Sequence, residues 1–355
     1  KIAKIVSTNP LATLPSVIGQ IENYDKVSEL IVATSKFFND FAYDVLQYTL
    51  LLKLTSGRNS TQADGVNQMM WVQRLAVFIA DLVKNSPKMD ITNIVVYVVK
   101  TLHKGDTVAL SILKELVSRV GGIRDLNEIS WSRLVMLNSG KCLQKAAREL
   151  ILDSRDDYSK RSIDLLHDFL KLNALSEVII LLQNLNLTAS TEHLHYKILS
   201  SKSDGMNALL WSFIEMVKYF LTDDQLVTNI LSFDKLINEF NVPTQWAFHI
   251  WRDYFNQMLH RNEESSNMVD EIIRKADFRG VDLSNMSNDL FINFWRLSLY
   301  DVQFNKSMYD DEKTKIEKQL VEAKSSRRRA ELNTKIQHIM SDCISHQKAY
   351  NDNKT

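Results

Sequence analysis

Residues 71–82 read WVQRLAVFIADL, and this stretch shows the pattern on which the fold depends. Large apolar side chains recur every three or four residues, at Trp71, Leu75, Phe78, Ile79 and Leu82. An α-helix makes one turn in about 3.6 residues, so this spacing places them on one face. The stretch therefore predicts an amphipathic helix with one buried face.

The same pattern extends in both directions from Asn23 to Val120 as paired amphipathic segments. Short polar breaks separate the segments near residues 39–40, 56–59, 85–87 and 104–106, as expected for helical hairpins. On the preceding helix we predict one buried stripe of Phe41, Val45, Tyr48 and Leu52. A later helix has a predicted buried face from Ile112 to Val120, ended by Gly121-Gly122. Hairpins that cannot bury their faces alone stack sideways, which predicts a solenoid.

Residues 139–262 continue in the same style, and the segment 246–259 is apolar or aromatic nearly all round, which predicts a central, deeply packed helix. The character changes after residue 302. Residues 306–354 hold 11 Lys/Arg and 8 Asp/Glu, and their few apolar residues form two narrow seams. A fold-back at 325–329 would bring the two seams together in a charged arm. The seams are Ile316, Leu320, Ala323 and Leu332, Ile336, Ile339, Cys343.

We therefore predict an all-α protein of stacked antiparallel helical hairpins, similar to a HEAT solenoid, that ends in a charged, coiled-coil-like arm. The predicted parts are a helical-repeat block at 1–125, a second helical block at 126–302 and the arm at 303–355. Only 9 glycines and 4 prolines occur in 355 residues, which leaves long stretches without a helix breaker.

Composition also limits the classes of function. Forty-three basic residues balance 43 acidic ones, so any contact with RNA must be local. The longest apolar stretches, such as 94–99, are too short to span a bilayer, so we expect a soluble chain without membrane contact. The two cysteines form no disulfide framework, which suits a reducing compartment such as the nucleus or cytosol. The chain has no initiator Met, and we expect it to be a portion of a longer protein.

The sequence contains no pattern typical of catalysis, so we expect no enzyme activity, cofactor or metal. Gly140-Lys141 lacks the earlier glycine of a phosphate-binding loop, because Val135 stands there. His193 and His195 lie two residues apart and would face different ways on a helix. The carboxylates at 153–157 and 223–224 are better explained as helix caps.

A few residues remain as candidates for binding. Lys324, Arg327, Arg328 and Arg329 place four positive charges within six residues, enough for a few phosphate contacts if they are exposed. Because no aromatic stacking residue lies beside them, a solvated turn of the arm is the favoured explanation. Trp71 and Trp131 lie nearest to helix ends and could anchor a partner. Lys100, His103 and Lys104 end a predicted helix, where they either complement the helix dipole or meet an acidic partner.

One junction is distinctive enough to indicate a family. Residues 294–301 read FWRLSLYD and run into a charged helix at 309–324. Further matching stretches are Asn9-Pro10, QIENYD at 20–25, YDVLQY at 43–48 and LKELV at 113–117, which leads to Gly122-Ile123. Together they resemble the family of the largest subunit of the THO complex, the nuclear assembly that packages messenger RNA.

The resemblance implies a role in transcription elongation, mRNA processing and mRNA export (TREX). It implies a non-enzymatic nuclear scaffold whose block 1–125 resembles the middle domain of translation-initiation scaffolds and docks and stimulates a DEAD-box RNA helicase. The implied partners are other THO subunits, this helicase and, weakly and without sequence preference, RNA. The alternative is a helical-repeat adaptor of another RNA machine, such as a cytoplasmic translation scaffold.

Overall fold

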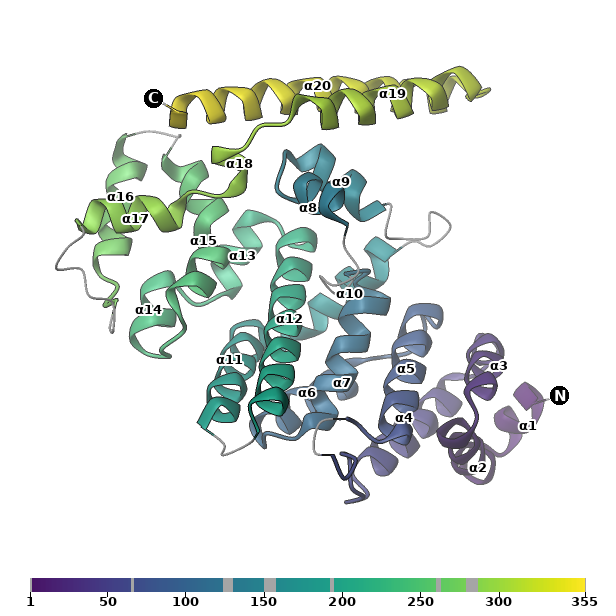
Figure 1. The fold of residues 1–355 in the computed structure, drawn as a ribbon. Helices are drawn as coiled ribbons and strands as arrows, with labels where there is room; N and C mark the ends of the chain where they lie inside the picture. Colours follow the sequence, from purple (N-terminus) through teal and green to yellow (C-terminus); the bar gives the residue numbers. More distant parts are fainter. Residues whose placement is uncertain are drawn as a thin grey trace. The chain divides into compact units, whose positions relative to one another are not determined.

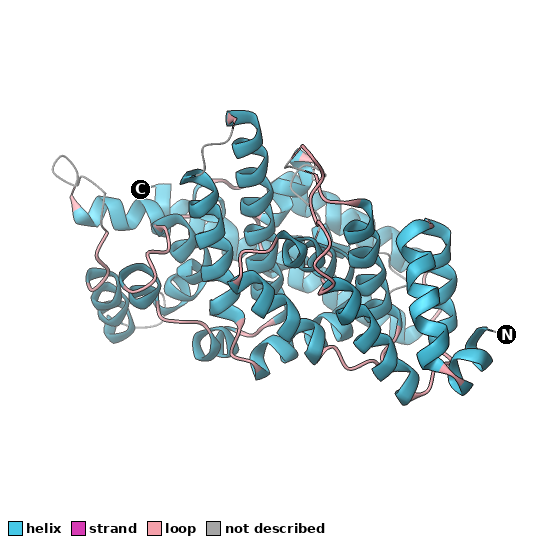
Figure 2. Cartoon of the chain, turned by 90° about the horizontal axis from the view of Figure 1, so that it is seen from below, coloured by secondary structure: helices cyan, strands magenta, loops and turns pink. Residues whose placement is uncertain are grey.

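The structure, a computed structural model, describes residues 2–64, 67–123, 130–149, 158–191, 195–259, 263–278 and 287–354. Helices make up most of these residues (Figure 2), and their only β-structure is one isolated bridge between Thr61 and Gln68. The predicted all-α class is confirmed. No helix among the described residues has the length and apolar character needed to cross a membrane.

Contacts group the helices into two compact units, and neither unit is continuous in sequence. Unit 1 consists of residues 1–125 and 157–231, and unit 2 of residues 126–156 and 232–355. The predicted division into 1–125, 126–302 and 303–355 describes the order of segments along the chain and stays a prediction. The two units are a different grouping, because packing joins segments that are distant in sequence.

Unit 1 contains two rows of stacked helices. In one row α5 lies between α3 and α7, and in the other α4 lies between α2 and α6 (Figure 1). This is the predicted stack of hairpins. The helices of the unit are α1 (Ile2–Thr8), α2 (Pro10–Asn23), α3 (Asp25–Ser35), α4 (Asp40–Leu54), α5 (Met70–Asn85), α6 (Thr92–His103), α7 (Thr107–Glu115), α10 (Tyr158–Lys171), α11 (Leu175–Thr191), α12 (Tyr196–Phe220) and α13 (Asp223–Asn229).

The end of α7 follows the sequence prediction. Its last turns widen into a π-helix (Leu116–Val120), and Gly122 adopts a left-handed backbone conformation with φ of 69°. A side chain at Gly121 would come within 2.5 Å of the Val117 carbonyl oxygen, so the sharp exit requires glycine there as well.

Two polar side chains at the start of α10 attach the later part of unit 1 to the stack. The buried guanidinium of Arg161 donates hydrogen bonds to the carbonyls of Val83 (2.6 and 2.8 Å) and Ser86 (2.9 Å) at the end of α5. The Ser162 hydroxyl donates to the Val120 carbonyl at 2.7 Å. Helix ends carry carbonyls without partners inside the helix, so these bonds satisfy groups that burial would otherwise leave unpaired.

The stripe on α5 is confirmed, whereas the stripe on α4 is wrong. Leu75, Phe78, Ile79 and Leu82 are fully buried. On α4, however, Phe41 is 56% exposed, Tyr48 63% and Leu52 55%, and only Val45 of the predicted set is buried. The buried face of α4 instead carries Ala42, Tyr43, Val45, Leu46, Thr49 and Leu50. Since α4 has apolar residues on more than one face, periodicity alone did not determine which face packs inward.

Unit 2 contains an aromatic core and the arm. The core surrounds α15, which is deeply packed as predicted: Phe248 and Phe255 are fully buried, and the ring of Trp295 stacks on Phe248 with centroids 6.3 Å apart. The helices are α8 (Trp131–Leu137), α9 (Lys141–Glu149), α14 (Phe233–Asn238), α15 (Thr244–Leu259), α16 (Glu263–Arg274), α17 (Asn288–Arg296), α18 (Leu299–Val302), α19 (Lys306–Glu322) and α20 (Ser326–Lys354).

Candidate interaction surfaces

The predicted partner anchor Trp71 lies in the first turn of α5 and is half-buried in a three-part stack. The guanidinium of Arg58 lies over its ring, 4.0 Å from the centroid. Arg58 in turn pairs through both terminal nitrogens with the carboxylate of Glu22, at 2.7 and 3.2 Å. The indole N–H donates to the Asn59 carbonyl at 3.1 Å. The indole is therefore fixed in one orientation by residues that spacing did not single out.

The basic end of α6 is exposed, and its histidine has an acidic partner within the chain. The ring of His103 contacts the carboxylate of Glu177 on α11. Within the described part of the chain, Lys100 and Lys104 are exposed and form no ion pair. The sequence could not reveal Glu177, because it lies 74 positions from His103.

Four of the five predicted partner-binding residues lie toward one end of unit 1. The amide of Gln68, just before α5, donates to the carbonyl of Thr107 at the start of α7, with a distance of 3.3 Å. This bond places the start of α5, with Trp71, beside the α6–α7 turn, with Lys104. Trp131 is different: it is the first residue of α8 in unit 2, 72% exposed, and stays a separate candidate.

The predicted RNA-contacting cluster lies at the turn between α19 and α20, and all four side chains are exposed. Arg327 and Arg328 share the carboxylate of Glu331 at 3.4 and 3.5 Å. Arg329 donates to the Ala323 carbonyl at 2.8 Å and so closes the turn. Exposed ion pairs are weak, so Arg327 and Arg328 still offer their charge to a phosphate. Arg329 also has a structural role.

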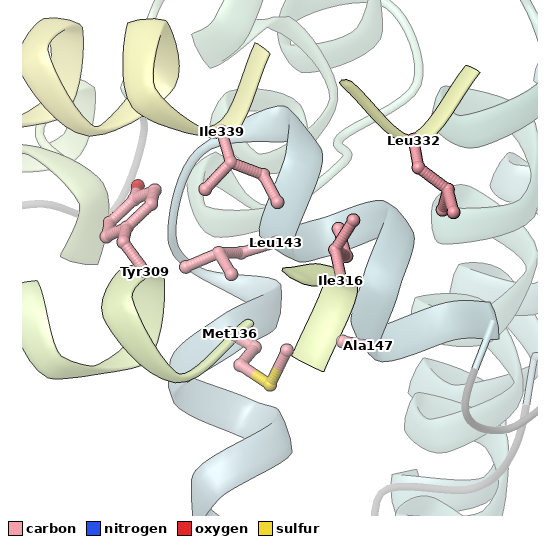
Figure 3. Packing of buried hydrophobic residues seen from close by; sticks show 7 residues of the cluster. All are labelled: Met136, Leu143, Ala147, Tyr309, Ile316, Leu332 and Ile339. Atoms are coloured by element: carbon pink, nitrogen blue, oxygen red, sulfur yellow. The ribbon is translucent and has the colours of Figure 1, made fainter. Parts of the chain in front are cut away.

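The arm folds back as predicted, and α19 and α20 lie side by side (Figure 1). Their two seams meet in one cluster, but they are not left open. The seam packs against α8 and α9 in one buried cluster (Figure 3). Leu332 is 1% exposed and Ile339 4%. Apolar spacing alone did not predict that α8 and α9 cover the arm. The cluster consists of Met136, Leu143, Ala147, Tyr309, Ile316, Leu332 and Ile339.

Polar contacts fix the arm to α9 beside this cluster. The Gly140 N–H donates to the Tyr309 hydroxyl at 2.8 Å, and that hydroxyl is hydrogen-bonded to Nδ1 of the buried His346 at 2.8 Å. The Cys142 N–H donates to the Asp342 carboxylate at 2.6 Å. A side chain at Gly140 would come within 2.8 Å of the Tyr309 hydroxyl, so the close approach requires glycine.

Burial makes these groups poor candidates for chemistry. It lowers the pKa of His346, which favours the neutral ring. Burial, together with the Asp342 carboxylate, raises the pKa of the Cys142 thiol to about 12, which disfavours the nucleophilic thiolate. Among the described residues no three His, Cys, Asp or Glu side chains gather as metal ligands would. His193 and residues 153–157 lie outside the described residues.

Comparison with known proteins points to one family. A family model described as "Transcription- and export-related complex subunit" matches residues 2–76, and one described as "Transcription factor/nuclear export subunit protein 2" matches residues 283–354. These are the two ends of the chain, where most of the matching stretches lie.

Full-length relatives cover the middle as well. The chain is 53% identical over 350 residues to THO complex subunit 2 of Saccharomyces cerevisiae, which covers 99% of this chain and 22% of the relative. It is 22% identical to THO complex subunit 2 of Arabidopsis thaliana, over 88% of this chain and 20% of the relative, and 24% identical to that of Homo sapiens, over 90% of this chain and 22% of the relative. The chain thus spans about a fifth of the length of these relatives. With similarity along almost its whole length, the chain belongs to the THO complex subunit 2 family.

Proposed function

We propose that this chain is part of a non-enzymatic scaffold subunit of a nuclear THO complex, and that its block 1–125 docks and stimulates a DEAD-box RNA helicase during mRNA packaging and export. The observation that supports this most is the 53% identity to a THO complex subunit 2 over 99% of the chain. The complex name comes from the relatives, and the helicase comes from the resemblance of block 1–125 to the helicase-binding middle domain of initiation scaffolds.

The exposed end of unit 1 supports the docking role. Two rows of packed helices form a firm support, and Trp71, Lys100 and Lys104 are displayed at or near its end. Lys100 and Lys104 complement acidic side chains of a partner, and a fixed aromatic ring supplies contact area at low entropic cost. A scaffold of this kind stimulates the helicase by binding most tightly those arrangements of its two lobes that speed nucleotide turnover.

The experiment measures RNA-dependent ATP hydrolysis by the export helicase with and without the full-length subunit in its complex. We expect a higher rate with the complex and a smaller increase when Lys100→Glu and Lys104→Glu are combined. The matched control combines Lys26→Glu and Lys197→Glu, which change the net charge equally at other exposed positions of unit 1. An unchanged helicase rate on adding the wild-type complex contradicts the proposal.

The basic turn of the arm is proposed to add weak RNA affinity that is blind to sequence. Replacing Lys324, Arg327, Arg328 and Arg329 with serine should lower RNA affinity only several-fold and reduce the salt dependence of log K by at most about 3, since each phosphate contact on a single strand contributes about 0.7. The control replaces Lys313 and Lys315, which pair with Glu317 and Glu312 on the same helix. Complete loss of RNA binding would show that the turn is a principal RNA site.

A further inference from the structure

Helix α4 displays a line of large apolar side chains that no described part of unit 1 covers. We call Phe37, Phe41, Tyr48 and Leu52 the α4 strip. Phe37, three residues before the helix, is 75% exposed, and the three helical members are 55–63% exposed. Single exposed apolar residues are ordinary, but three along one helix, with a fourth just before it, mark a binding surface.

The helix that carries the strip is held firmly from its other side. The buried Tyr43 hydroxyl donates to the Ser35 carbonyl at 2.7 Å, and the Ser35 and Ser86 hydroxyls are hydrogen-bonded at 2.8 Å. The Asn93 side chain donates to the Gln47 side chain at 3.2 Å, and the Asn39 side chain caps the first turn. The strip therefore lies on a packed helix, and its orientation is fixed by the fold.

The spacing within the strip fits one helix lying lengthwise. Phe41, Tyr48 and Leu52 follow each other at intervals of seven and four residues, which is the spacing of a coiled-coil seam. Asp44 occupies the same face between Phe41 and Tyr48, and it is exposed. A line of this width accepts the apolar seam of one further helix, packed at the shallow crossing angle of left-handed coiled coils.

The charges along the strip indicate the chemistry of that helix. Asp40 and Asp44 are both exposed, and within the described residues neither carboxylate has an ion-pair or hydrogen-bond partner. They lie beside the N-terminal half of the strip, near Phe37 and Phe41. An incoming helix would place there the residues that border its apolar seam. Lysine or arginine at those positions gains from the pairing, whereas aspartate or glutamate is repelled.

We propose that the α4 strip binds one amphipathic helix of another protein subunit, with apolar residues in its seam and lysine or arginine beside them. The proposal rests on the exposed residues of α4 and on Asp40 and Asp44, none of which is assigned to helicase docking, so it stands whether or not that assignment is correct.

The test uses the full-length subunit in its assembled complex, with the photo-crosslinking amino acid p-benzoylphenylalanine in place of Tyr48. Irradiation and mass spectrometry should find one crosslinked peptide from another subunit, helical, with basic residues next to its apolar seam. The matched control places the same amino acid at Tyr196, which is 68% exposed in the same unit and should give no crosslink to that peptide. A crosslink to an acidic or non-helical segment, to RNA or to a second copy of this chain, or no crosslink, overturns the proposal.

A second variant tests the charge pairing on its own. Combining Asp40→Lys and Asp44→Lys should lower the Tyr48 crosslinking yield by about tenfold, and changing the basic residues of the crosslinked helix to glutamate should restore it. Both carboxylates are exposed, so the helical circular dichroism signal should not change. A yield that is indifferent to the charge reversal overturns the basic character of the partner helix.

Discussion

Helices α4 and α20 each carry an apolar stripe that the sequence predicts to be buried, yet only the stripe of α20 is. The α4 members Phe41, Tyr48 and Leu52 are more than half exposed, whereas Leu332 and Ile339 on α20 are at most 4% exposed. Helix α20 is otherwise polar and charged, so its few apolar residues determine one possible inner face. Helix α4 has apolar residues on more than one face, so its sequence is compatible with more than one inner face.

The inner face of α4 was decided by polar groups that find partners there. Tyr43, Gln47 and Thr49 are buried and hydrogen-bonded, and burying them without partners would be costly. An orientation that buried Phe41 and Tyr48 instead would lose the bonds of Tyr43 to Ser35 and of Gln47 to Asn93, whereas the Thr49 hydroxyl bonds to Val45 within α4 in either orientation. The difference teaches that side-chain hydrogen bonds choose between two apolar faces. Four experiments, by substitution or by pH, test how the arm around α20 and the exposed face of α4 are packed.

The largest effect is expected for Ile339→Asp in the arm seam. A buried carboxylate in the cluster with α8 and α9 should cost about 3–5 kcal/mol, measured by urea unfolding and by hydrogen exchange of α19 and α20. Ile344→Asp on the same helix is the control, since Ile344 is 67% exposed and its replacement should cost about 0.5 kcal/mol. Equal losses for both variants would mean that the seam is not covered.

A smaller loss is expected for Gly140→Ala. The added carbon would lie 2.8 Å from the Tyr309 hydroxyl and 3.1 Å from the Asp342 carboxylate, so the arm must shift away from α9 at a cost of about 1–3 kcal/mol. The control is Gly205→Ala within α12, where nothing lies within 4 Å and alanine should stabilise the helix by about 0.5–1 kcal/mol. Urea unfolding of both variants separates the cost of the close contact at Gly140 from the gain in helix propensity that alanine brings. A Gly140→Ala variant with unchanged free energy of unfolding would rule out this close contact.

Acidification should weaken the arm through His346. Burial lowers its pKa below the ordinary 6.5, although the carboxylates of Asp301 and Asp342 oppose the shift. A group whose pKa is lower in the folded state contributes its full stability above pH 6.5, and the contribution falls as pH drops toward the folded pKa. The loss is at most about 1.4 kcal/mol per pH unit.

Urea unfolding of unit 2 at pH 7.5 and pH 5.5 measures this effect. The His346→Gln variant should be less stable at both values but should show a smaller difference between them. Tyr300 and Tyr309 also face the ring, but burial raises their pKa values, so they stay protonated in this range. Identical pH dependence in the two proteins would show that His346 is already charged or exposed.

The smallest stability effect is expected on the α4 strip. Tyr48→Ser should change the free energy of unfolding by no more than about 0.5 kcal/mol, because the ring is 63% exposed in the chain alone. Tyr43→Ser, five positions earlier on the inner face, is the comparison and should cost several kcal/mol. A large loss for Tyr48→Ser in the isolated chain would place the strip in the core and remove the basis for a docked helix.

Much of the fold could be predicted from the sequence because it depends on local order. Helix positions follow from the apolar spacing, and the end of α7 follows from Gly121 and Gly122. The fold-back of the arm follows from its two apolar seams, because one continuous helix would not place them on the same face. The candidate sites were predicted less well. Spacing found the exposed Lys100 and Lys104 but not Glu22, Arg58 or Glu177, since their partners are distant in sequence.

The sequence by itself determined that the chain is helical, roughly where the breaks between the first helices fall, and which family it belongs to, because propensity, spacing and local motifs act within a few turns. The break near 56–59 is longer than predicted, since α4 ends at Leu54 and α5 begins at Met70. Only the tertiary structure decided which face of α4 packs inward, that α8 and α9 cover the arm, and that residues 157–231 join the first block. These outcomes depend on burial and hydrogen bonds between residues far apart in the chain, such as Tyr309 with Gly140 and Arg161 with Val83. No local pattern contains them, since each group finds its partner only once the helices have packed.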